Sequence, residues 1–309
     1  MANLKELCKK EEGLTGGHRL CSGCGAGTIA RQALLAAADK PVVVVSATGC
    51  LEVSTTIFPY TAWKTPFMHS AFENAGATCS GIESAYRSLK KQGKLSDDIR
   101  FIAFGGDGGT YDIGLQSLSG AMERGHKMLY ICYNNEAYMN TGIQRSGATP
   151  KGAHTTTAPT GKVKQGKEQH RKDLTQIMIA HDIPYVAQSA VGYWNDFISK
   201  VQKALTIDGP SFINILQPCR LGWGYKPEDT MVLGRMAVET CLWPMYEVEN
   251  GKYKINMKPK AKKPVTDFFK PQARFKHLFK PENQAIIDDI QQATDAKWEK
   301  LQKLEATFA

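Results

Sequence analysis

One segment near residue 105 restricts the fold of this 309-residue chain more than any other. Arg100–Phe104 is mostly apolar and predicts a buried strand, which leads into the glycine-rich loop Gly105–Gly109. A helical pattern from about Ile113 to Arg124 follows, and then a second apolar strand, Met128–Tyr133. Strand, glycine loop, helix and strand in this order form a βαβ unit, which belongs to a parallel sheet with helices on both faces.

The same alternation continues on both sides of this unit. Hydrophobic periodicity predicts helices over about Gly25–Lys40, Ala75–Gln92, Asp173–His181 and Tyr193–Thr206, and strands over Val42–Val45, Tyr185–Gln188 and Phe212–Leu216. The stretch from Ala47 to about Phe72 lacks such a pattern and is expected to be a loop. The predicted fold class is therefore α/β, with a doubly wound, mostly parallel sheet over roughly residues 20–220.

The chain changes character after residue 220. Residues 250–280 contain many Lys and Pro residues without periodicity, which predicts an extended arm, and a helix is expected from about Pro281 to Ala306. We therefore divide the chain into a main α/β domain, residues 1–245, and a C-terminal arm and helix, residues 246–309. A tail of this kind is expected to wrap a neighbouring subunit or its own domain.

The charge balance restricts the partners of the chain. Lys and Arg number 39 against 30 Asp and Glu, a net charge of +9. Such an excess suits nucleic acid, an anionic substrate or an acidic protein. The basic clusters Lys151–Lys172 and Lys252–Lys280 lack the interleaved aromatic residues of a single-strand-binding groove, so we expect no nucleic acid. We favour an acidic protein partner, and acidic electron carriers are one class of such partners.

Two further observations concern the location of the protein. The longest apolar run, around Val42–Val45, is too short to span a bilayer, and Met1–Glu6 has no apolar stretch after its charges. We therefore expect a cytoplasmic protein without membrane contact. In that compartment paired thiols more often serve metal or redox chemistry than disulfides.

The glycine loop contains an acidic residue where a phosphate is expected to bind. Gly105–Gly109 follows a strand and opens a helix, and a helix N-terminus offers free N–H groups to phosphate. Tyr111 stands where a dinucleotide fingerprint needs glycine, and no Gly-Lys-Ser/Thr follows as in a P-loop. Because Asp107 would repel a diphosphate, a cation such as Mg²⁺ is implied between them.

Four of the eight cysteines lie just beyond predicted strand or helix ends. Cys21 and Cys24 form a Cys-x-x-Cys pair before the first helix, Cys50 follows the strand Val42–Val45, and Cys219 follows the last strand. These positions can converge on one edge of the sheet. The pair alone is compatible with thioredoxin-like redox chemistry, zinc or an iron–sulfur cluster.

Gly106-Asp107-Gly108, followed at this distance by Asn134-Asn135, resembles the thiamine diphosphate motif. In that family the aspartate, the second residue of the later pair and a backbone carbonyl two residues on hold Mg²⁺. The resemblance assigns these roles to Asp107, Asn135 and Ala137. The competing interpretation is a tight βα turn followed by a capping loop.

The two motifs together resemble the thiamine-binding β subunits of pyruvate and related 2-oxoacid:ferredoxin oxidoreductases. The similarity extends over nearly the whole chain, through Thr48–Cys50, Phe72–Ala75, Asn135–Gln144, Tyr246–Gly251 and Gln272–Leu278. It implies a thiamine-diphosphate-binding fold. It also favours a [4Fe–4S] cluster over zinc as the group held by the four cysteines.

The resemblance assigns site residues. Cys21, Cys24, Cys50 and Cys219 correspond to the ligands of the cluster nearest the cofactor, and Asn140 corresponds to the catalytic position beside the reactive thiazolium. Cofactor contacts are expected at Thr48, Gly49, Gly106, Asp107, Gly108, Gly109, Asn135, Ala137, Asn140 and Thr141. The glutamate that activates the aminopyrimidine comes from a partner α subunit, so this chain alone is expected to bind the cofactor poorly and to catalyse nothing.

The implied reaction is oxidative decarboxylation of a 2-oxoacid. Pyruvate and coenzyme A would give acetyl-CoA and CO₂, with electrons leaving through the cluster to γ/δ-type subunits with further clusters and then to ferredoxin. Lys151-Gly152-Ala153-His154 departs from the Tyr-Gly-Ala of pyruvate enzymes. The departure either adds a cation for an anionic substrate such as oxalate, which needs no coenzyme A, or leaves Lys151 as a solvated loop residue. A non-redox thiamine enzyme and a zinc-stabilised interaction protein are the remaining alternatives.

Overall fold

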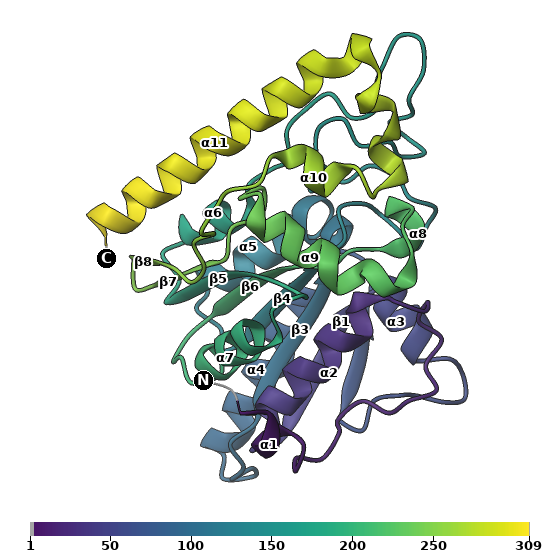
Figure 1. Cartoon of the computed structure of the whole chain (residues 1–309). Helices are drawn as coiled ribbons and strands as arrows, with labels where there is room; N and C mark the ends of the chain where they lie inside the picture. Colours follow the sequence, from purple (N-terminus) through teal and green to yellow (C-terminus); the bar gives the residue numbers. More distant parts are fainter. Residues whose placement is uncertain (1–2, 309) are drawn as a thin grey trace.

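One mixed sheet organises the computed structural model, which describes residues 3–308 (Figure 1). Its strand order within these residues is β2-β1-β3-β4-β6-β5-β7-β8. The first six strands pair in parallel, whereas β7 is antiparallel to β5 and β8 to β7. The strands are β1 (Val42–Ala47), β2 (Phe67–Ser70), β3 (Arg100–Gly106), β4 (Leu129–Asn134), β5 (Tyr185–Ala190), β6 (Ser211–Leu216), β7 (Tyr246–Glu249) and β8 (Lys252–Ile255). The predicted doubly wound, mostly parallel sheet is confirmed.

Helices cover both faces of the sheet because its strands bury side chains on both sides. Val44 and Ile102 belong to one core, and their neighbours Val45 and Ala103 to the other. Residues of α2 (Gly25–Ala37) and α7 (Trp194–Ala204) complete the first core. Residues of α4 (Ala75–Lys91), α5 (Leu115–Glu123) and α6 (Leu174–Ile179) complete the second.

The predicted loop between Ala47 and Phe72 is wrong in two places. Helix α3 (Cys50–Thr55) begins three residues after β1, and β2 pairs with β1 as the edge strand. Both elements are short, and β2 exposes Met68 and His69. Neither therefore leaves an apolar period long enough to recognise in the sequence.

The helix after the glycine loop begins earlier than predicted. Gly108–Asp112 form one π-helical turn, and α5 follows. Glycine disfavours helix interiors, so the sequence pattern starts only at Ile113. Single π-helical turns are frequent at functional sites.

The C-terminal part packs onto the rest of the chain. In β7, Val248 pairs with Val186 of β5, which adds the β7–β8 hairpin to the sheet. The extended arm predicted for residues 250–280 is wrong over much of its length, since this stretch contains β8, helix α10 (Val265–Phe269) and a 3₁₀ helix (Ala273–Phe279). The remaining helices are α1 (Leu4–Leu7), α8 (Arg220–Trp223), α9 (Thr230–Glu239), α10 (Val265–Phe269) and α11 (Gln284–Thr307), with 3₁₀ turns at Pro227–Asp229, Ala273–Phe279 and Pro281–Asn283.

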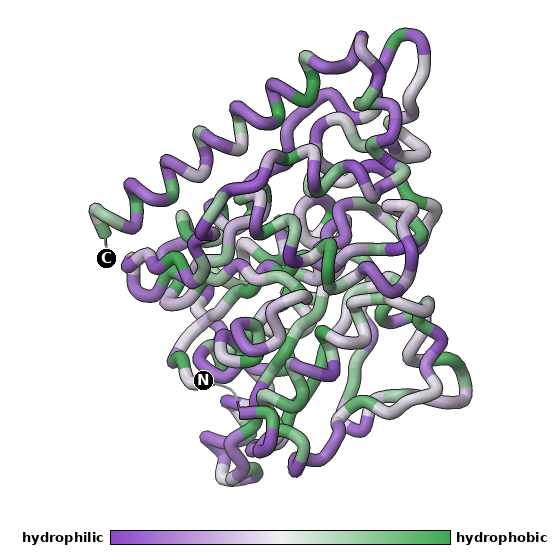
Figure 2. The backbone as a smooth tube through the Cα atoms, in the orientation of Figure 1, coloured by the Kyte–Doolittle hydropathy of each residue, from purple (hydrophilic) through white to green (hydrophobic). Residues whose placement is uncertain are grey.

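A third core joins α9, α10 and α11 to the body. It includes Trp223, Phe268, Phe275 and Ile290, all buried. Figure 2 shows hydrophobic strands at the centre of the molecule and a mostly hydrophilic α11 along its side. The division of the chain at residue 245, and the wrapping of a neighbouring subunit by the tail, stay predictions. Within residues 3–308 we find no helix with the length and apolarity that a membrane span requires.

Candidate cofactor site

The loops after β1, β3 and β4 enclose one pocket at the carboxyl edge of the sheet, where parallel strand ends meet. This pocket is lined by every residue for which a cofactor contact is predicted: Thr48, Gly49, Gly106, Asp107, Gly108, Gly109, Asn135, Ala137, Asn140 and Thr141. Phe72, Tyr133, Tyr138 and Met139 also line it and were not predicted as site residues. Three of these four, Phe72, Tyr138 and Met139, lie in segments that carry the resemblance. The resemblance therefore covers their positions, but it does not show that their side chains face the pocket.

Three oxygen-bearing groups converge on one point of this pocket. The end of the Asn135 amide that faces Asp107 and Ala137 lies 2.9 Å from Asp107 Oδ1 and 2.8 Å from the Ala137 carbonyl oxygen. If the amide nitrogen of Asn135 occupies this end, it donates to both Asp107 Oδ1 and the Ala137 carbonyl oxygen. If the amide oxygen occupies it, the oxygens of Asn135, Asp107 and Ala137 face one another. Adjacent ligands of an octahedral Mg²⁺ at about 2.1 Å stand about 3 Å apart, so the oxygen orientation fits this cation.

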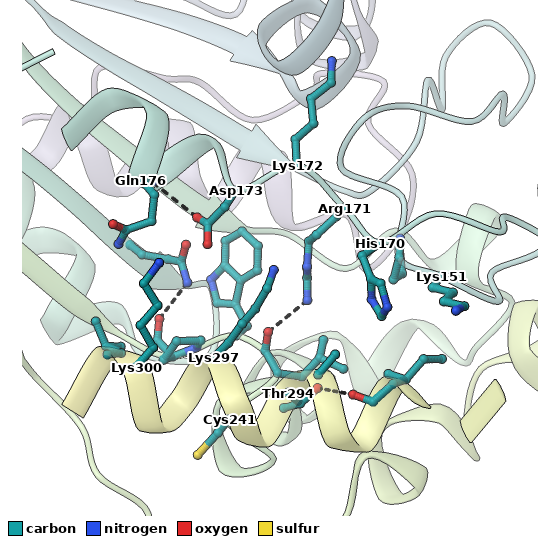
Figure 3. Close-up of a pocket in the computed structure, with 18 of the residues that line it drawn as sticks. Lys151, His170, Arg171, Lys172, Asp173, Gln176, Cys241, Thr294, Lys297 and Lys300 are labelled. Carbon is teal, nitrogen blue, oxygen red and sulfur yellow. Dashed lines mark hydrogen bonds between the residues drawn. The ribbon is translucent and has the colours of Figure 1, made fainter. Parts of the chain in front are cut away.

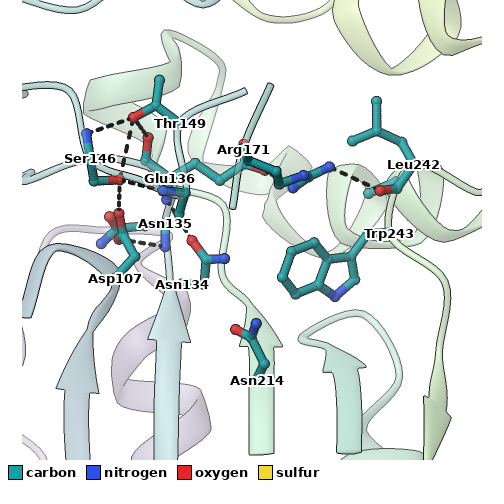
Figure 4. Close-up of polar contacts among 12 residues, drawn as sticks. Asp107, Asn134, Asn135, Glu136, Ser146, Thr149, Arg171, Asn214, Leu242 and Trp243 are labelled. Atoms are coloured by element: carbon teal, nitrogen blue, oxygen red, sulfur yellow. Dashed lines mark hydrogen bonds and ion pairs between the residues drawn. The ribbon is translucent and has the colours of Figure 1, made fainter. Parts of the chain in front are cut away.

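Asp107 is held in an environment that disfavours a free carboxylate. Ser146 Oγ donates to its Oδ2 at 2.5 Å, and the Asn135 N–H donates to its Oδ1 at 3.2 Å (Figure 4). Burial nevertheless raises the pKa of Asp107 to about 7, since the side chain is almost wholly removed from water. A divalent cation at the three oxygens would reverse this effect.

The loop that carries Asn135 and Ala137 is fixed by a buried charge network. Glu136 has a φ of 66° and no exposed surface. Its carboxylate accepts from Arg171 at 2.7 Å and from Arg274 at 2.6 Å. Neither arginine was predicted, because they lie 35 and 138 residues away along the chain. Two guanidinium groups on one carboxylate hold this left-handed residue in place.

Trp223 connects the same loop to the segment after Cys219. Its Nε1 donates to the Asn135 carbonyl oxygen at 2.7 Å, and its backbone N–H donates to Cys219 O at 2.9 Å. The Arg274 guanidinium lies 3.8 Å from the centroid of the Trp223 ring. The candidate cation site and the Cys219 segment therefore share one rigid support.

Gly108 must be glycine because of a close approach. A Cβ at this position would lie 2.4 Å from the ring of Tyr138. The glycine therefore lets the aromatic side chain close over the π-helical turn whose N–H groups begin the helix.

The four cysteines lie at the start of three helices on this side of the sheet. Cys24 caps α2, Cys50 is the first residue of α3, and Cys219 caps α8. The Cys24 N–H donates to Cys21 O at 2.9 Å across the turn that links the pair. Gly23 in that turn has a φ of 74°, which glycine adopts without strain.

The four thiols are within electrostatic reach of one another. Burial raises the pKa of Cys50 to about 12, and proximity to Cys219, Cys24 and Cys21 adds to the effect. Backbone N–H groups of Ala26 and Gly27 bond to Cys24, and those of Leu221 and Gly222 bond to Cys219. Within residues 3–308, no three His, Cys, Asp or Glu side chains stand as close together as the ligands of a single metal ion.

The remaining predicted residues lie at the margin or outside. Asn140 and Thr141 form the exposed rim of the pocket. Lys151 does not line the pocket: its Nζ donates to Asp289 of α11 at 2.7 Å, and its side chain is 24% exposed. Lys151 is therefore neither an additional cation in this pocket nor a freely solvated residue.

Comparison with known proteins identifies the family. Residues 47–215 match the family model described as "Thiamine pyrophosphate enzyme, C-terminal TPP binding domain". Pyruvate synthase subunit PorB of Thermotoga maritima is 51% identical over 98% of this chain and 96% of its own length. Pyruvate synthase subunit PorB of Methanocaldococcus jannaschii is 55% identical over 93% of this chain and 96% of its own length.

A solved structure supports the fold. A 2-oxoglutarate:ferredoxin oxidoreductase from Magnetococcus marinus superimposes with a TM-score of 0.56 at 20% identity, over 72% of this chain and 79% of that chain. This likeness concerns the fold alone. The two close relatives and the matching thiamine-binding domain lead to one conclusion: the chain belongs to the family of thiamine-diphosphate-binding β subunits of the 2-oxoacid:ferredoxin oxidoreductases.

Proposed function

We propose that the chain is the β subunit of a pyruvate:ferredoxin oxidoreductase, which oxidises pyruvate with coenzyme A to acetyl-CoA and CO₂. The observation that carries this proposal is that the candidate cation site and one of the four cysteines line the same pocket. The oxygen atoms of Asp107, Asn135 and Ala137 converge there, and Cys50 lines the same pocket. A cation-held cofactor and a cysteine-held electron acceptor would then be neighbours.

Asp107, Asn135 and the Ala137 carbonyl would hold Mg²⁺, and the N–H groups of the turn at Gly108 would face the diphosphate. When bound, thiamine diphosphate supplies the nucleophilic carbon and the electron sink of the decarboxylation. The chain's own part is to orient: Ser146 fixes the Asp107 carboxylate, and the two arginines on Glu136 fix the loop between the other two ligands.

Cys21, Cys24, Cys50 and Cys219 would hold a [4Fe–4S] cluster. In such a cluster each thiolate binds its own iron atom, so the four sulfurs stand further apart than around one zinc ion. The N–H donors to Cys24 and Cys219 suit an anionic cluster and would raise its reduction potential.

Pyruvate is favoured over oxalate as the substrate. The oxalate alternative rests on Lys151, and this ammonium is paired with Asp289 outside the pocket. Both relatives described above are subunits of pyruvate synthases. A related subunit of a ketoisovalerate oxidoreductase from Pyrococcus abyssi, 46% identical over 96% of this chain and 95% of its own, shows that branched 2-oxoacids must be assayed beside pyruvate.

A partner α subunit would complete the site. Among residues 3–308, Asp107 is the only acidic side chain that lines the pocket, so the glutamate for the aminopyrimidine would come from another chain. The exposed rim at Asn140 and Thr141 leaves room for it. We further propose γ/δ-type subunits with additional clusters, ferredoxin as the final acceptor, and a cytoplasmic location.

The test is anaerobic purification of the complex formed with its partner subunits. We expect brown protein containing iron, Mg²⁺ and thiamine diphosphate, and reduction of ferredoxin that requires both pyruvate and coenzyme A. Oxalate oxidation without coenzyme A would instead support the alternative substrate. Colourless protein without iron would support a non-redox thiamine enzyme, and zinc without thiamine would support an interaction protein.

A further inference from the structure

A second cavity, separate from the cofactor pocket, lies between α11 and the segment that leads into α6 (Figure 3). Its volume is ≈ 330 Å³, within the range of small-molecule sites. Residues 150–151, 170–176 and 241–246 form one wall, and residues 290–304 of α11 form the other. Among residues 3–308 the two cavities share no lining residue.

The lining of this cavity is strongly basic. Five Lys or Arg residues line it, together with His170, against a single acidic residue, Asp173. Three of the five already have acidic partners, since Lys151 pairs with Asp289, Arg171 with Glu136, and Lys172 with Asp112. Because Arg171 shares Glu136 with Arg274, the unbalanced charge comes from Arg171 and from the two lysines without an acidic partner, Lys297 and Lys300 of α11.

Lys297 and Lys300 have no hydrogen bond or ion pair with another part of residues 3–308. Both side chains extend from α11 toward the segment that carries Arg171 and Asp173, whereas Lys172 points away from the cavity (Figure 3). Lys297 and Lys300 are both exposed at the mouth of the cavity. Partial removal from water and the nearby charges of Arg171 and Lys300 lower the pKa of Lys297, against the opposing effect of Asp173. An anion between the two ammonium groups would offset their mutual repulsion.

An apolar wall stands beside the two lysines. Trp243 and Leu301 are 2% and 5% exposed and line the cavity with Leu304. The Arg171 guanidinium lies 5.1 Å from the centroid of the Trp243 ring. A ligand with a flat apolar body and an anionic end matches this combination better than a bare inorganic ion does.

We propose that this cavity binds a small organic dianion, a dicarboxylate or a phosphate monoester on a flat apolar body. Its charge lies between Lys297 and Lys300, and its body lies along the apolar wall, mainly against Leu304, which is more exposed than Trp243 or Leu301. Arg171 connects the cavity to the cofactor pocket, because the same guanidinium donates to Glu136, the residue between Asn135 and Ala137. Occupancy of the cavity therefore changes the affinity of the cation site.

The binding claim stands by itself, whereas the coupling to the cation site rests on the proposed function. Binding is measured by calorimetry on the full-length chain with phenyl phosphate, phthalate and inorganic phosphate at constant ionic strength. We expect at least one of the two aromatic dianions to bind more tightly than inorganic phosphate. The ratio of the affinities for phenyl phosphate and phthalate shows whether the site prefers a phosphate or a carboxylate. The Lys297→Met/Lys300→Met variant is expected to bind about tenfold more weakly, because each charge-assisted hydrogen bond contributes substantially.

Lys303→Met is the matched control, since Lys303 is an exposed residue of α11 that does not line the cavity. No binding of the three anions, or equal loss in the control, overturns the proposal. Mg²⁺ titration of the complex, with thiamine diphosphate present and with and without saturating dianion, then tests the coupling, with an expected change in affinity of about fivefold or more. An unchanged Mg²⁺ affinity overturns the coupling. A complex that binds the dianion but, with thiamine diphosphate present, no Mg²⁺ overturns the cation site of the proposed function and leaves the anion site standing.

Discussion

Glu136 shows how much a single residue contributes to the site without itself contacting the pocket. Its carboxylate has no exposed surface and lies between two guanidinium groups. Its left-handed backbone sets the direction in which Asn135 and Ala137 face the converging point. The Glu136 carboxylate therefore acts indirectly, by holding Asn135 and Ala137 in their orientations.

We predict that Glu136→Gln lowers the free energy of unfolding by about 3–5 kcal/mol, since it leaves the buried Arg274 and the partly buried Arg171 without their counter-charge. It is also expected to weaken Mg²⁺ binding in the folded protein. Urea unfolding and Mg²⁺ titration measure the two effects. Glu282→Gln, at an exposed position, is the control and is expected to change neither quantity. Full stability in the Glu136 variant would contradict the role of the network.

Asp107 predicts a dependence of stability on pH. Its pKa is raised from 3.8 to about 7 in the folded chain. Between these values the folded state binds more protons than the unfolded state, so this residue makes the chain without Mg²⁺ less stable as the pH rises from about 4 to 7. Above pH 7 the full cost of the buried carboxylate is present.

The corresponding measurement is thermal unfolding at pH 5.5 and 7.5, with and without Mg²⁺. We expect Mg²⁺ to stabilise the chain more at pH 7.5, because at pH 5.5 the cation must displace a proton from Asp107. In Asp107→Asn this difference is expected to vanish. Equal stabilisation by Mg²⁺ at both pH values in the unsubstituted chain would contradict the assignment.

At the scale of elements, the C-terminal segment holds part of the core although it resembles a polar tail. The 3₁₀ helix Ala273–Phe279 contributes Phe275, which is fully buried and stacks near Phe269 with ring centroids 4.2 Å apart. The adjacent Arg274 is the residue that reaches Glu136. The segment therefore supports the cofactor site through the contact of Arg274 with Glu136.

We predict that Phe275→Ala costs about 3–5 kcal/mol of unfolding free energy, through lost burial and the cavity left behind. Phe279→Ala lies in the same element but replaces a side chain that is 41% exposed, and it is expected to cost less than about 1 kcal/mol. Chemical denaturation of both variants provides the comparison. Similar costs for the two would mean that this segment does not pack as described.

At the scale of the whole molecule, three separate regions of the chain supply the proposed cluster ligands. We predict that Cys219→Ser reduces the iron content of the anaerobically purified complex and alters the spectrum of the cluster, because one thiolate of four is lost. Cys8→Ser is the control, since Cys8 is exposed and lies in none of the three regions. Iron analysis and electron paramagnetic resonance measure both. Normal iron and an unchanged spectrum in Cys219→Ser would exclude this residue as a ligand.

The order of the βαβ units could be predicted from the sequence because both faces of the parallel strands are buried. That burial leaves continuous apolar runs such as Val42–Val45 and Met128–Tyr133, which are visible without any knowledge of contacts. The short β2 and α3, and the hairpin β7–β8, leave no such pattern. Their conformation depends on pairing with neighbours, as β7 does with β5.

The sequence by itself determined the glycine–aspartate loop, the asparagine that follows the next strand and the positions of the four cysteines, because each is a local motif placed at the end of a regular element. Only the tertiary structure decided which charges support them. Arg171 and Arg274 reach Glu136 from distant segments, and Lys151 pairs with Asp289 instead of lining the pocket. Such ion pairs depend on the folded path of the chain, because the sequence does not show which oppositely charged side chain a given Lys or Arg will contact.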